Sequence, residues 1–183
     1  MNHADHVYLL RGGAITPGGV WADLGSGTGA FTLALAELLS PQGEIFSVDK
    51  DRAALRQQEV AMRKQFPGIH TQYLAANFIQ PLDLPPLDGI LMANALHYQK
   101  QKEPLVKTLK GYLKPAGRFI LVEYNVDQGN PWVPYPLSFS TWEVLARRCG
   151  FTGTRLLARV PSRFLKEFYS AVSDCSAGDA TRS

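Results

Sequence analysis

A glycine-rich segment at residues 23–29, with the sequence DLGSGTG, is the clearest candidate for chemistry in this chain. It follows the apolar residues 20–22 and precedes an apolar helical pattern at residues 31–39, so it connects an expected strand to an expected helix. Glycines let a ligand approach the main chain closely, and the helix start offers unpaired N–H groups and a positive dipole end. Asp23 is unusual there, because a negative charge repels a pyrophosphate and suits a cofactor that carries positive charge. The segment therefore predicts a turn that binds a nucleoside cofactor with positive charge.

Other candidate side chains stand where later strands are expected to end. They are Asp49 after residues 44–48, Asn77 after residues 69–75, His97 and Tyr98 after residues 87–93, and Glu123 and Tyr124 at the end of residues 118–124. Open α/β sheets bind ligands beyond the carboxyl ends of their strands, so these side chains are expected at one edge of a sheet. An imidazole there can serve as a general base, although a histidine can equally pack at a strand-to-helix turn.

The elements that must position these residues alternate between strand-like and helix-like apolar periods, which is typical of an α/β protein with a mostly parallel sheet. Helices are expected at residues 51–66, 104–113 and 140–150, the last opening with a capping box at Ser140. Residues 151–160 and 164–172 are expected to pair as an antiparallel hairpin, because their connection is too short for a parallel crossover. One domain is thus predicted over residues 1–172, with a disordered tail at residues 173–183.

The bulk properties are those of an ordinary globular protein. The chain has 183 residues, 45% of them hydrophobic, and a net charge of +3, which is too small to indicate nucleic acid by itself. No apolar run reaches the roughly 18 to 20 residues that span a membrane, and the N-terminus does not resemble a signal peptide. Cys149 and Cys175 form no metal-binding pair, so no metal and a reducing, cytoplasmic location are expected.

Four segments, in order and at characteristic spacing, make the chain resemble the class I S-adenosylmethionine-dependent methyltransferases. They are residues 23–29 (DLGSGTG), 48–51 (VDKD), 88–97 (DGILMANALH) and 113–119 (LKPAGRF). The resemblance covers most of the chain and implies a single-domain, three-layer α/β/α sandwich. Its seven-stranded sheet is mostly parallel and ends in a C-terminal antiparallel hairpin. It also implies S-adenosylmethionine as cofactor and methyl transfer to an O, N, S or C nucleophile, with a small organic molecule as the favoured substrate.

The same resemblance implies the cofactor contacts. Asp23 would help hold the methionine amino group, the glycine turn would lie under the cofactor, and Asp49 would accept hydrogen bonds from both ribose hydroxyls. Asn77 would face the adenine amino group unless it is only a turn residue, and Phe78 would pack on the adenine or on the core. The complete predicted set is Asp23, Gly25, Ser26, Gly27, Thr28, Gly29, Asp49, Lys50, Asn77, Phe78, Asn94 and Ala95.

His97, Tyr98 and Tyr124 are the predicted catalytic residues, with His97 as the candidate base. Aromatic residues in the following proline-rich stretch could form a substrate wall or anchor the loop to the core: Trp132, Tyr135 and Phe139. His3 and His6 share one face of a possible helix, so a metal site is conceivable there, although a solvated or capping role is favoured.

Two other functions remain open from the sequence. Residues 25–30 also satisfy the loose dinucleotide pattern G-x-G-x-x-A, so an NAD(P)-binding oxidoreductase is the first alternative. Asp23 beside a pyrophosphate argues against it. A non-catalytic methyltransferase-like binding module is the second alternative. A nucleic-acid or protein substrate stays open, and a homodimer is possible.

Overall fold

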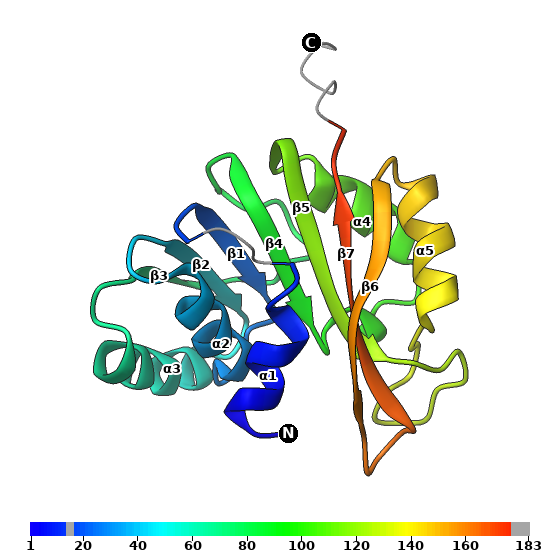
Figure 1. Cartoon of the computed structure of the whole chain (residues 1–183), viewed down its shortest axis with the longest axis horizontal. Helices are drawn as coiled ribbons and strands as arrows, with labels where there is room; N and C mark the ends of the chain where they lie inside the picture. Colours follow the sequence, from blue (N-terminus) through cyan, green and yellow to red (C-terminus); the bar gives the residue numbers. More distant parts are fainter. Residues whose placement is uncertain (14–16, 177–183) are drawn as a thin grey trace.

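A seven-stranded sheet organises the computed structural model, which describes residues 1–13 and 17–176. Its spatial order is β3-β2-β1-β4-β5-β7-β6 (Figure 1). The first five strands run parallel, and β7 runs antiparallel to both β5 and β6. This confirms the predicted sheet with its terminal hairpin. The strands are β1 (Val20–Leu24), β2 (Glu44–Asp49), β3 (His70–Ala75), β4 (Leu87–Ala93), β5 (Leu113–Tyr124), β6 (Thr152–Pro161) and β7 (Glu167–Asp174).

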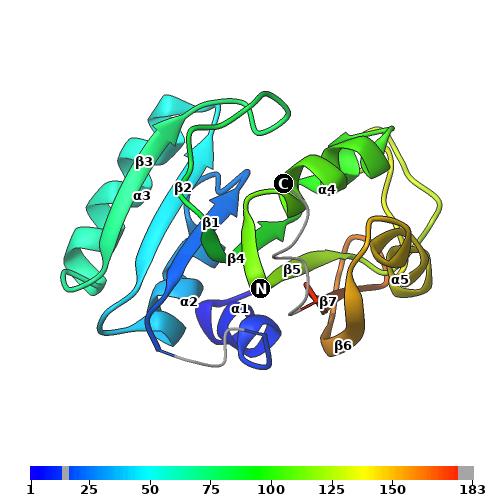
Figure 2. The same cartoon turned by 90° about the horizontal axis from the view of Figure 1, so that it is seen from above.

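Two layers of helices cover the sheet, one on each face (Figure 2). The first layer contains α1 (His3–Leu10), α2 (Ala30–Leu39) and α3 (Arg52–Gln65). The second contains α4 (Lys102–Lys110) and α5 (Phe139–Arg148), and a 3-10 turn (Leu96–Tyr98) follows β4. The three-layer prediction is therefore confirmed.

Side chains that alternate along the central strands fill the two halves of the core. On β5, Ile120 and Val122 pack with the α1–α2 layer, whereas Phe119 and Leu121 pack with the α4–α5 layer. All four are fully buried, as expected for a strand covered on both faces. The buried middle of the sheet holds the strand ends in a fixed register, and those strand ends carry the site.

The connection between β3 and β4 contains no helix. Residues 76–86 cross the sheet as a loop whose Leu82 and Leu84 pack against the core of the α4–α5 layer. The backbone N–H of Leu82 donates to the Tyr112 hydroxyl at 2.9 Å, which ties the loop to the start of β5. The beginning of this loop, with Asn77 and Phe78, stays at the carboxyl edge of the sheet.

Four predicted boundaries were wrong. β5 begins at Leu113 rather than at residue 118, and α4 ends at Lys110. Helix α5 has Ser138, not Ser140, as its N-cap, and the Ser138 side chain accepts from the backbone N–H of Thr141. The last strand runs to Asp174, beyond the predicted end at residue 172, because its end still pairs with the start of the regular part of β5. Of the predicted tail, residues 177–183 lie outside the described residues.

Candidate active site

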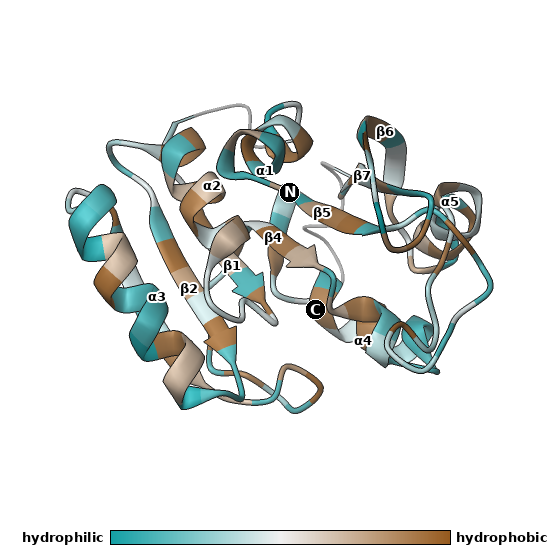
Figure 3. Ribbon diagram, turned by 90° about the horizontal axis from the view of Figure 1, so that it is seen from below, coloured by the Kyte–Doolittle hydropathy of each residue, from teal (hydrophilic) through white to brown (hydrophobic). Residues whose placement is uncertain are grey.

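The carboxyl ends of four neighbouring strands form one edge of the molecule. β2, β1, β4 and β5 are consecutive in the sheet and parallel, so their ends meet at this edge, which Figure 3 views directly. In Figure 1 the arrowheads of β1 and β4 point toward the same lower edge. Along it lie Asp49 at the end of β2, Gly25 after β1, Asn94 after β4 and Glu123 at the end of β5. The sequence-predicted candidates are thus brought together by strand order.

A cavity of about 440 Å³ opens at the β2–β1–β4 part of this edge. It has the size of a small-molecule site. Tyr98 and Gln99 close it on the β4 side. Its lining includes these predicted cofactor residues: Gly25, Asp49, Lys50, Asn77, Phe78, Asn94 and Ala95.

The glycine turn brings bare backbone to the floor of this cavity. Gly25 has a φ of +77°, and a Cβ added there would lie 2.6 Å from the Cβ of Ala95 and 3.2 Å from the ring of Phe78. Only glycine fits this position without strain. The backbone N–H groups of Gly25 and Ser26 both donate to the carbonyl of Val48, at 2.8 and 3.1 Å. The turn is therefore fixed against β2 before any ligand binds.

The rest of the turn has structural roles outside the cavity lining. Ser26 accepts a hydrogen bond from the Ser47 hydroxyl at 2.7 Å, and Gly29 is the N-cap of α2 with a φ of +88°. Neither these two residues nor Gly27 and Thr28 belong to the lining. A Cβ on Gly27 would meet nothing within 4 Å, so this position faces open space.

The Asp49 carboxylate is held in place by two backbone donors. The N–H of Gly27 donates to its Oδ2 and the N–H of Asp51 to its Oδ1, both at 2.8 Å. Asp51 itself caps α3 by accepting from Ala53 and Ala54. Each carboxylate oxygen has a further lone pair. Asp49 can therefore accept two more hydrogen bonds from a ligand. Helix capping does not explain why an acid stands at position 49, because Asp51 is the N-cap of α3.

Asp23 lies beneath the cavity rather than in its wall. Its side chain is 1% exposed and accepts a 2.5 Å hydrogen bond from the Thr32 hydroxyl. Burial raises the pKa of Asp23 to about 7, with the nearby Asp49 charge adding to the rise and Thr32 opposing it. Because this pKa is near neutral, a positive charge close to Asp23 would shift its buried carboxyl group toward the ionised form at neutral pH.

The side-chain oxygens of Asn77 and Asn94 differ in their hydrogen bonding. The Asn77 Oδ1 accepts a 3.3 Å hydrogen bond from the N–H of Ile79, as a turn residue does. Asn94 adopts a φ of +53°, and its buried Oδ1 has no hydrogen-bond partner among the described residues. An orphaned buried oxygen costs free energy unless a ligand or water satisfies it, so Asn94 marks the cavity as a polar binding site.

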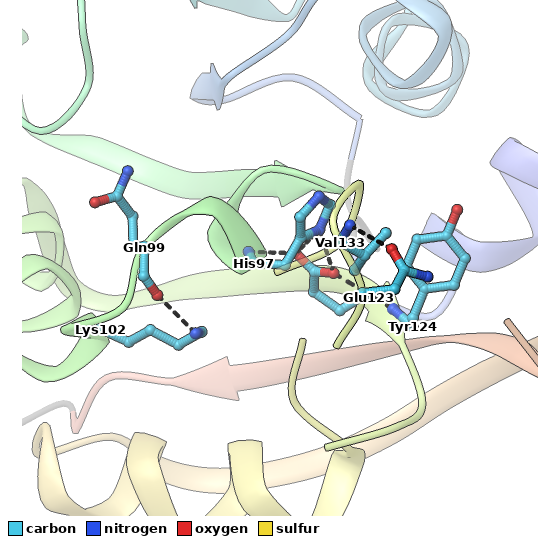
Figure 4. Close-up of polar contacts among 7 residues, drawn as sticks. His97, Gln99, Lys102, Glu123, Tyr124 and Val133 are labelled. Atoms are coloured by element: carbon cyan, nitrogen blue, oxygen red, sulfur yellow. Dashed lines mark hydrogen bonds and ion pairs between the residues drawn. The ribbon is translucent and has the colours of Figure 1, made fainter. Parts of the chain in front are cut away.

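A buried histidine–glutamate pair lies next to the cavity. The His97 Nδ1 is 2.9 Å from Oε2 and 3.1 Å from Oε1 of Glu123, and the His97 backbone N–H donates to Oε1 at 3.0 Å (Figure 4). His97 is 3% exposed and Glu123 is fully buried. A carboxylate on Nδ1 favours the tautomer that leaves Nε2 as the proton acceptor. Sequence reasoning noted both residues at strand ends but missed their pairing.

The other two predicted catalytic residues flank His97. The Tyr98 ring centroid lies 4.3 Å from that of His97 and the Tyr124 centroid 6.2 Å. Tyr98 is 59% exposed and lines the 440 Å³ cavity. Tyr124 is partly buried, and this burial raises the pKa of its hydroxyl group. Lys102 approaches from α4: its Nζ donates to the Gln99 carbonyl at 2.7 Å, and burial lowers its pKa although Glu123 opposes that.

The remaining sequence candidates separate into anchors and exposed side chains. Phe139 packs against Tyr169, with ring centroids 6.0 Å apart, whereas Trp132 and Tyr135 are 71% and 41% exposed. The Tyr135 N–H donates to the His97 carbonyl at 3.0 Å, which ties this loop to the site. In α1, His3 contacts Glu37 at 2.8 Å and His6 packs on Phe31. Within the described part of the chain, no three potential ligands gather around a metal position.

The fold and the site define a class I S-adenosylmethionine-dependent methyltransferase. Residues 15–149 match a methyltransferase domain family, and the chain belongs to that family. This match decides against the dinucleotide-binding oxidoreductase. None of the helices within residues 1–13 and 17–176 combines the length and apolar character that a bilayer crossing requires.

Similar proteins agree with this assignment. A ubiquinone/menaquinone biosynthesis C-methyltransferase, UbiE, from Pasteurella multocida is 28% identical over 105 residues, covering 56% of this chain and 39% of the relative. The chain thus matches about two fifths of that relative's length. The YcgJ protein from Bacillus subtilis shares the fold with a TM-score of 0.76 at 15% identity, covering 96% of this chain and all of that chain. An S-adenosylmethionine-dependent methyltransferase from Aquifex aeolicus gives a TM-score of 0.70 at 18% identity, covering 93% and 89% of the two chains.

The cavity's chemistry fits this cofactor. The glycine at position 25 leaves room where a Cβ would collide, and the orphaned Oδ1 of Asn94 can accept from a ligand. Asp49 presents carboxylate oxygens suited to a vicinal diol. These residues therefore fit S-adenosylmethionine, the cofactor of this class of methyltransferase.

Proposed function

We propose that the protein transfers a methyl group to a carbon atom of a small organic acceptor, with His97 as the general base. The observation that carries this proposal is the buried His97–Glu123 pair at the ends of β4 and β5. Carbon acids need a base, because the nucleophilic electron pair forms only when a proton leaves. Thiols and amines depend less on such a group. The name of the similar UbiE protein, a C-methyltransferase, supports the same choice.

The donor-side residues would hold the cofactor through the contacts already described. Asp49 would accept from the ribose hydroxyls, Asn77 would face the adenine, and Gly25 and Ala95 would contact the methionine end by backbone. Asp23 would supply negative charge beneath the amino group. When bound, S-adenosylmethionine supplies a sulfonium methyl group whose carbon an electron pair can attack, with the neutral thioether S-adenosylhomocysteine as the leaving group. Keeping this group dry and aligned is the protein's main contribution.

On the acceptor side, the base step follows from the geometry of the pair. Glu123 holds the Nδ1–H of His97, so Nε2 takes the proton from the acceptor carbon. The electron pair left on that carbon is the nucleophile that forms the new carbon–carbon bond. His97 becomes an imidazolium, and the fully buried Glu123 carboxylate stabilises this cation in a low-dielectric setting. Tyr98 and Tyr124 would position the acceptor on either side of the imidazole.

The experiment compares acceptor classes and variants. Transfer is measured with 1,3-dicarbonyl carbon acids and with thiols and amines, for the wild type, His97→Gln and Glu123→Gln. S-adenosylhomocysteine gives the rate, and the methylated atom of the product is identified. His70→Gln is the matched control, because His70 also contacts a glutamate, Glu44, at 3.0 Å but is exposed. We expect carbon methylation in the wild type and a loss of about 100-fold in His97→Gln, the scale of a general base.

Calorimetry with S-adenosylhomocysteine shows whether each variant keeps its donor site. The proposal requires His97→Gln to bind it as the wild type does while carbon methylation is lost. Full carbon methylation by His97→Gln, or transfer only to thiols and amines, would overturn the base assignment. S-adenosylhomocysteine binding without transfer to any acceptor would favour a non-catalytic binding module.

A further inference from the structure

A second cavity, of about 570 Å³, lies at the same edge beyond β5. The first turn of α1, the end of β5 and the turn between β6 and β7 surround it. Figure 1 shows that the start of α1 and the β6–β7 turn both reach the lower edge of the molecule. Tyr124 lines this cavity and also contacts His97, with ring centroids 6.2 Å apart. The cavity therefore reaches the proposed base through Tyr124, as the first cavity reaches it through Tyr98.

The wall of this cavity is aromatic. The rings of Tyr124 and Phe168 lie 4.2 Å apart, and Phe164 meets Tyr124 edge-on at 6.1 Å. Trp132, from the loop before α5, lies outside the cavity lining and contacts Phe164 edge-on, with ring centroids 6.4 Å apart. Phe164 and Trp132 are 52% and 71% exposed, although large apolar side chains are usually buried. Exposed aromatic rings around a cavity provide flat apolar surfaces that can stack on a planar ligand.

The cations of this hairpin differ in whether an acidic side chain pairs with them. Arg155 donates to Asp174 at 2.9 Å and Arg159 lies 3.5 Å from Glu167, so both are paired. Arg163 lines the cavity, and among the described residues it has neither a hydrogen bond nor an ion pair. The acidic side chain in the same lining, Asp5, already accepts from the N–H of Asn2 at 2.8 Å as part of a capping box.

We propose that this cavity binds the methyl acceptor, and that the acceptor is a planar aromatic or conjugated molecule with an anionic group that Arg163 recognises. This assignment of the acceptor rests on the proposed function, whereas the anion-selective aromatic cavity does not. The reacting carbon lies at the Tyr124 end, beside His97, and the anionic group at the Arg163 end. The cavity volume suits one molecule of that kind. Guanidinium groups pair with carboxylate, sulfonate or phosphate oxygens through two parallel hydrogen bonds.

The test uses two dyes that share their aromatic system and differ in charge. 8-Anilinonaphthalene-1-sulfonate is anionic, and N-phenyl-1-naphthylamine is the same arene without the sulfonate. Each is titrated by fluorescence into protein saturated with S-adenosylhomocysteine, so that the donor cavity is filled. We expect one sulfonate dye to bind per chain, more tightly than the neutral dye. Binding without saturation, or preference for the neutral dye, would overturn the proposal.

Variants then locate the dye. Arg163→Gln should weaken the anionic dye about fivefold, as a charge-assisted contact near solvent does, and leave the neutral dye within about twofold. Phe164→Ala should weaken both dyes. Lys166→Gln is the matched control, since it removes the same charge from the same turn at an exposed position outside the cavity lining. If Arg163→Gln and Lys166→Gln weakened the anionic dye equally, its binding would depend on the overall positive charge of the turn and not on a specific site. That result would refute the role of Arg163.

Dye binding and methyl transfer can fail separately. Selective dye binding combined with no transfer to carbon acids would refute the proposed function but would still support the anion site. Carbon methylation that neither dye inhibits would leave the proposed function standing and refute this cavity as the acceptor site. Arg163→Lys, which keeps the charge but not the planar fork, should bind the anionic dye with intermediate affinity.

Discussion

Substituting Asp23 by asparagine should change how the stability of the protein depends on pH. In the folded state, burial raises the pKa of this carboxyl to about 7 from its ordinary value of 3.8. Between these two values the unfolded chain has lost the proton and the folded protein still holds it. Stability therefore falls as pH rises through this window, because the folded state binds more protons. An asparagine side chain at this position cannot ionise and can still accept the Thr32 hydrogen bond.

The magnitude follows from the width of that window. Between pH 5 and pH 8 the Asp23 carboxyl ionises at about 7, so about two pH units contribute at 1.36 kcal/mol each. The free energy of unfolding of the wild type should fall by about 3 kcal/mol more than that of Asp23→Asn over this range. The assay is urea unfolding of both proteins at pH 5 and pH 8 without ligand, analysed by linear extrapolation.

The comparison of the two proteins isolates this one group. His6, whose pKa is lowered by burial, gives a pH dependence of opposite sign, but both proteins contain it and its effect cancels in the difference. Parallel profiles for the two proteins, within about 0.5 kcal/mol, would refute the reasoning, because they would show that Asp23 ionises normally in the folded state.

Two further substitutions test the donor cavity by calorimetry with S-adenosylhomocysteine. Asp49→Ala should weaken binding by about 1.5 to 3 kcal/mol, the scale of hydrogen bonds to a charged group; Asp51→Ala, which removes only the α3 cap, should lower stability by about 1 kcal/mol and retain affinity. Unchanged affinity in Asp49→Ala would contradict the ribose role. Gly25→Ala places a Cβ 2.6 Å from that of Ala95 at a φ of +77°, so affinity should fall at least about tenfold at a stability cost of about 1 to 3 kcal/mol. Normal binding by this variant would show that the turn relaxes freely.

The fold was predictable because its signals are local. Most of the parallel strands are short apolar runs, such as residues 87–93, and several helices have their own start or stop residue, such as Asp51 before α3. The start of β5 was missed because residues 115–117 carry turn-forming types. In the structure Ala116 has a φ of +62° and the β4–β5 register shifts before Arg118, so the strand continues through an irregular segment. Only pairing with β4 reveals it as strand.

The α5 boundary depended on a tertiary contact. Ser138 and Ser140 are both suitable N-cap residues by type. Asp127, eleven residues away, accepts from both the backbone N–H and the hydroxyl of Ser138, at 2.9 and 2.8 Å. These bonds fix the helix start two residues earlier than the sequence pattern indicated. A contact of this kind has no local signature.

The donor side was more predictable than the acceptor side for the same reason. Contiguous motifs place Gly25 and Asp49 near the cofactor, because strand, turn and helix follow one another in the chain. The His97–Glu123 pair joins the ends of β4 and β5 across 26 residues of sequence. The second cavity joins α1 to the last hairpin, across most of the chain. Both depend on sheet order, which a single sequence expresses weakly.

Adjacent residues at the end of β5 explain how one strand can serve both proton transfer and acceptor binding. Successive side chains of a strand point to opposite faces, so Glu123 follows Phe119 and Leu121 toward the α4–α5 layer, and Tyr124 follows Ile120 and Val122 toward the α1 layer. Glu123 is thereby buried where a carboxylate can hold an imidazole, and Tyr124 enters the aromatic cavity. His97 lies over the strand end and contacts both. A one-residue shift in the β4–β5 register would exchange these faces and separate the base from its acceptor.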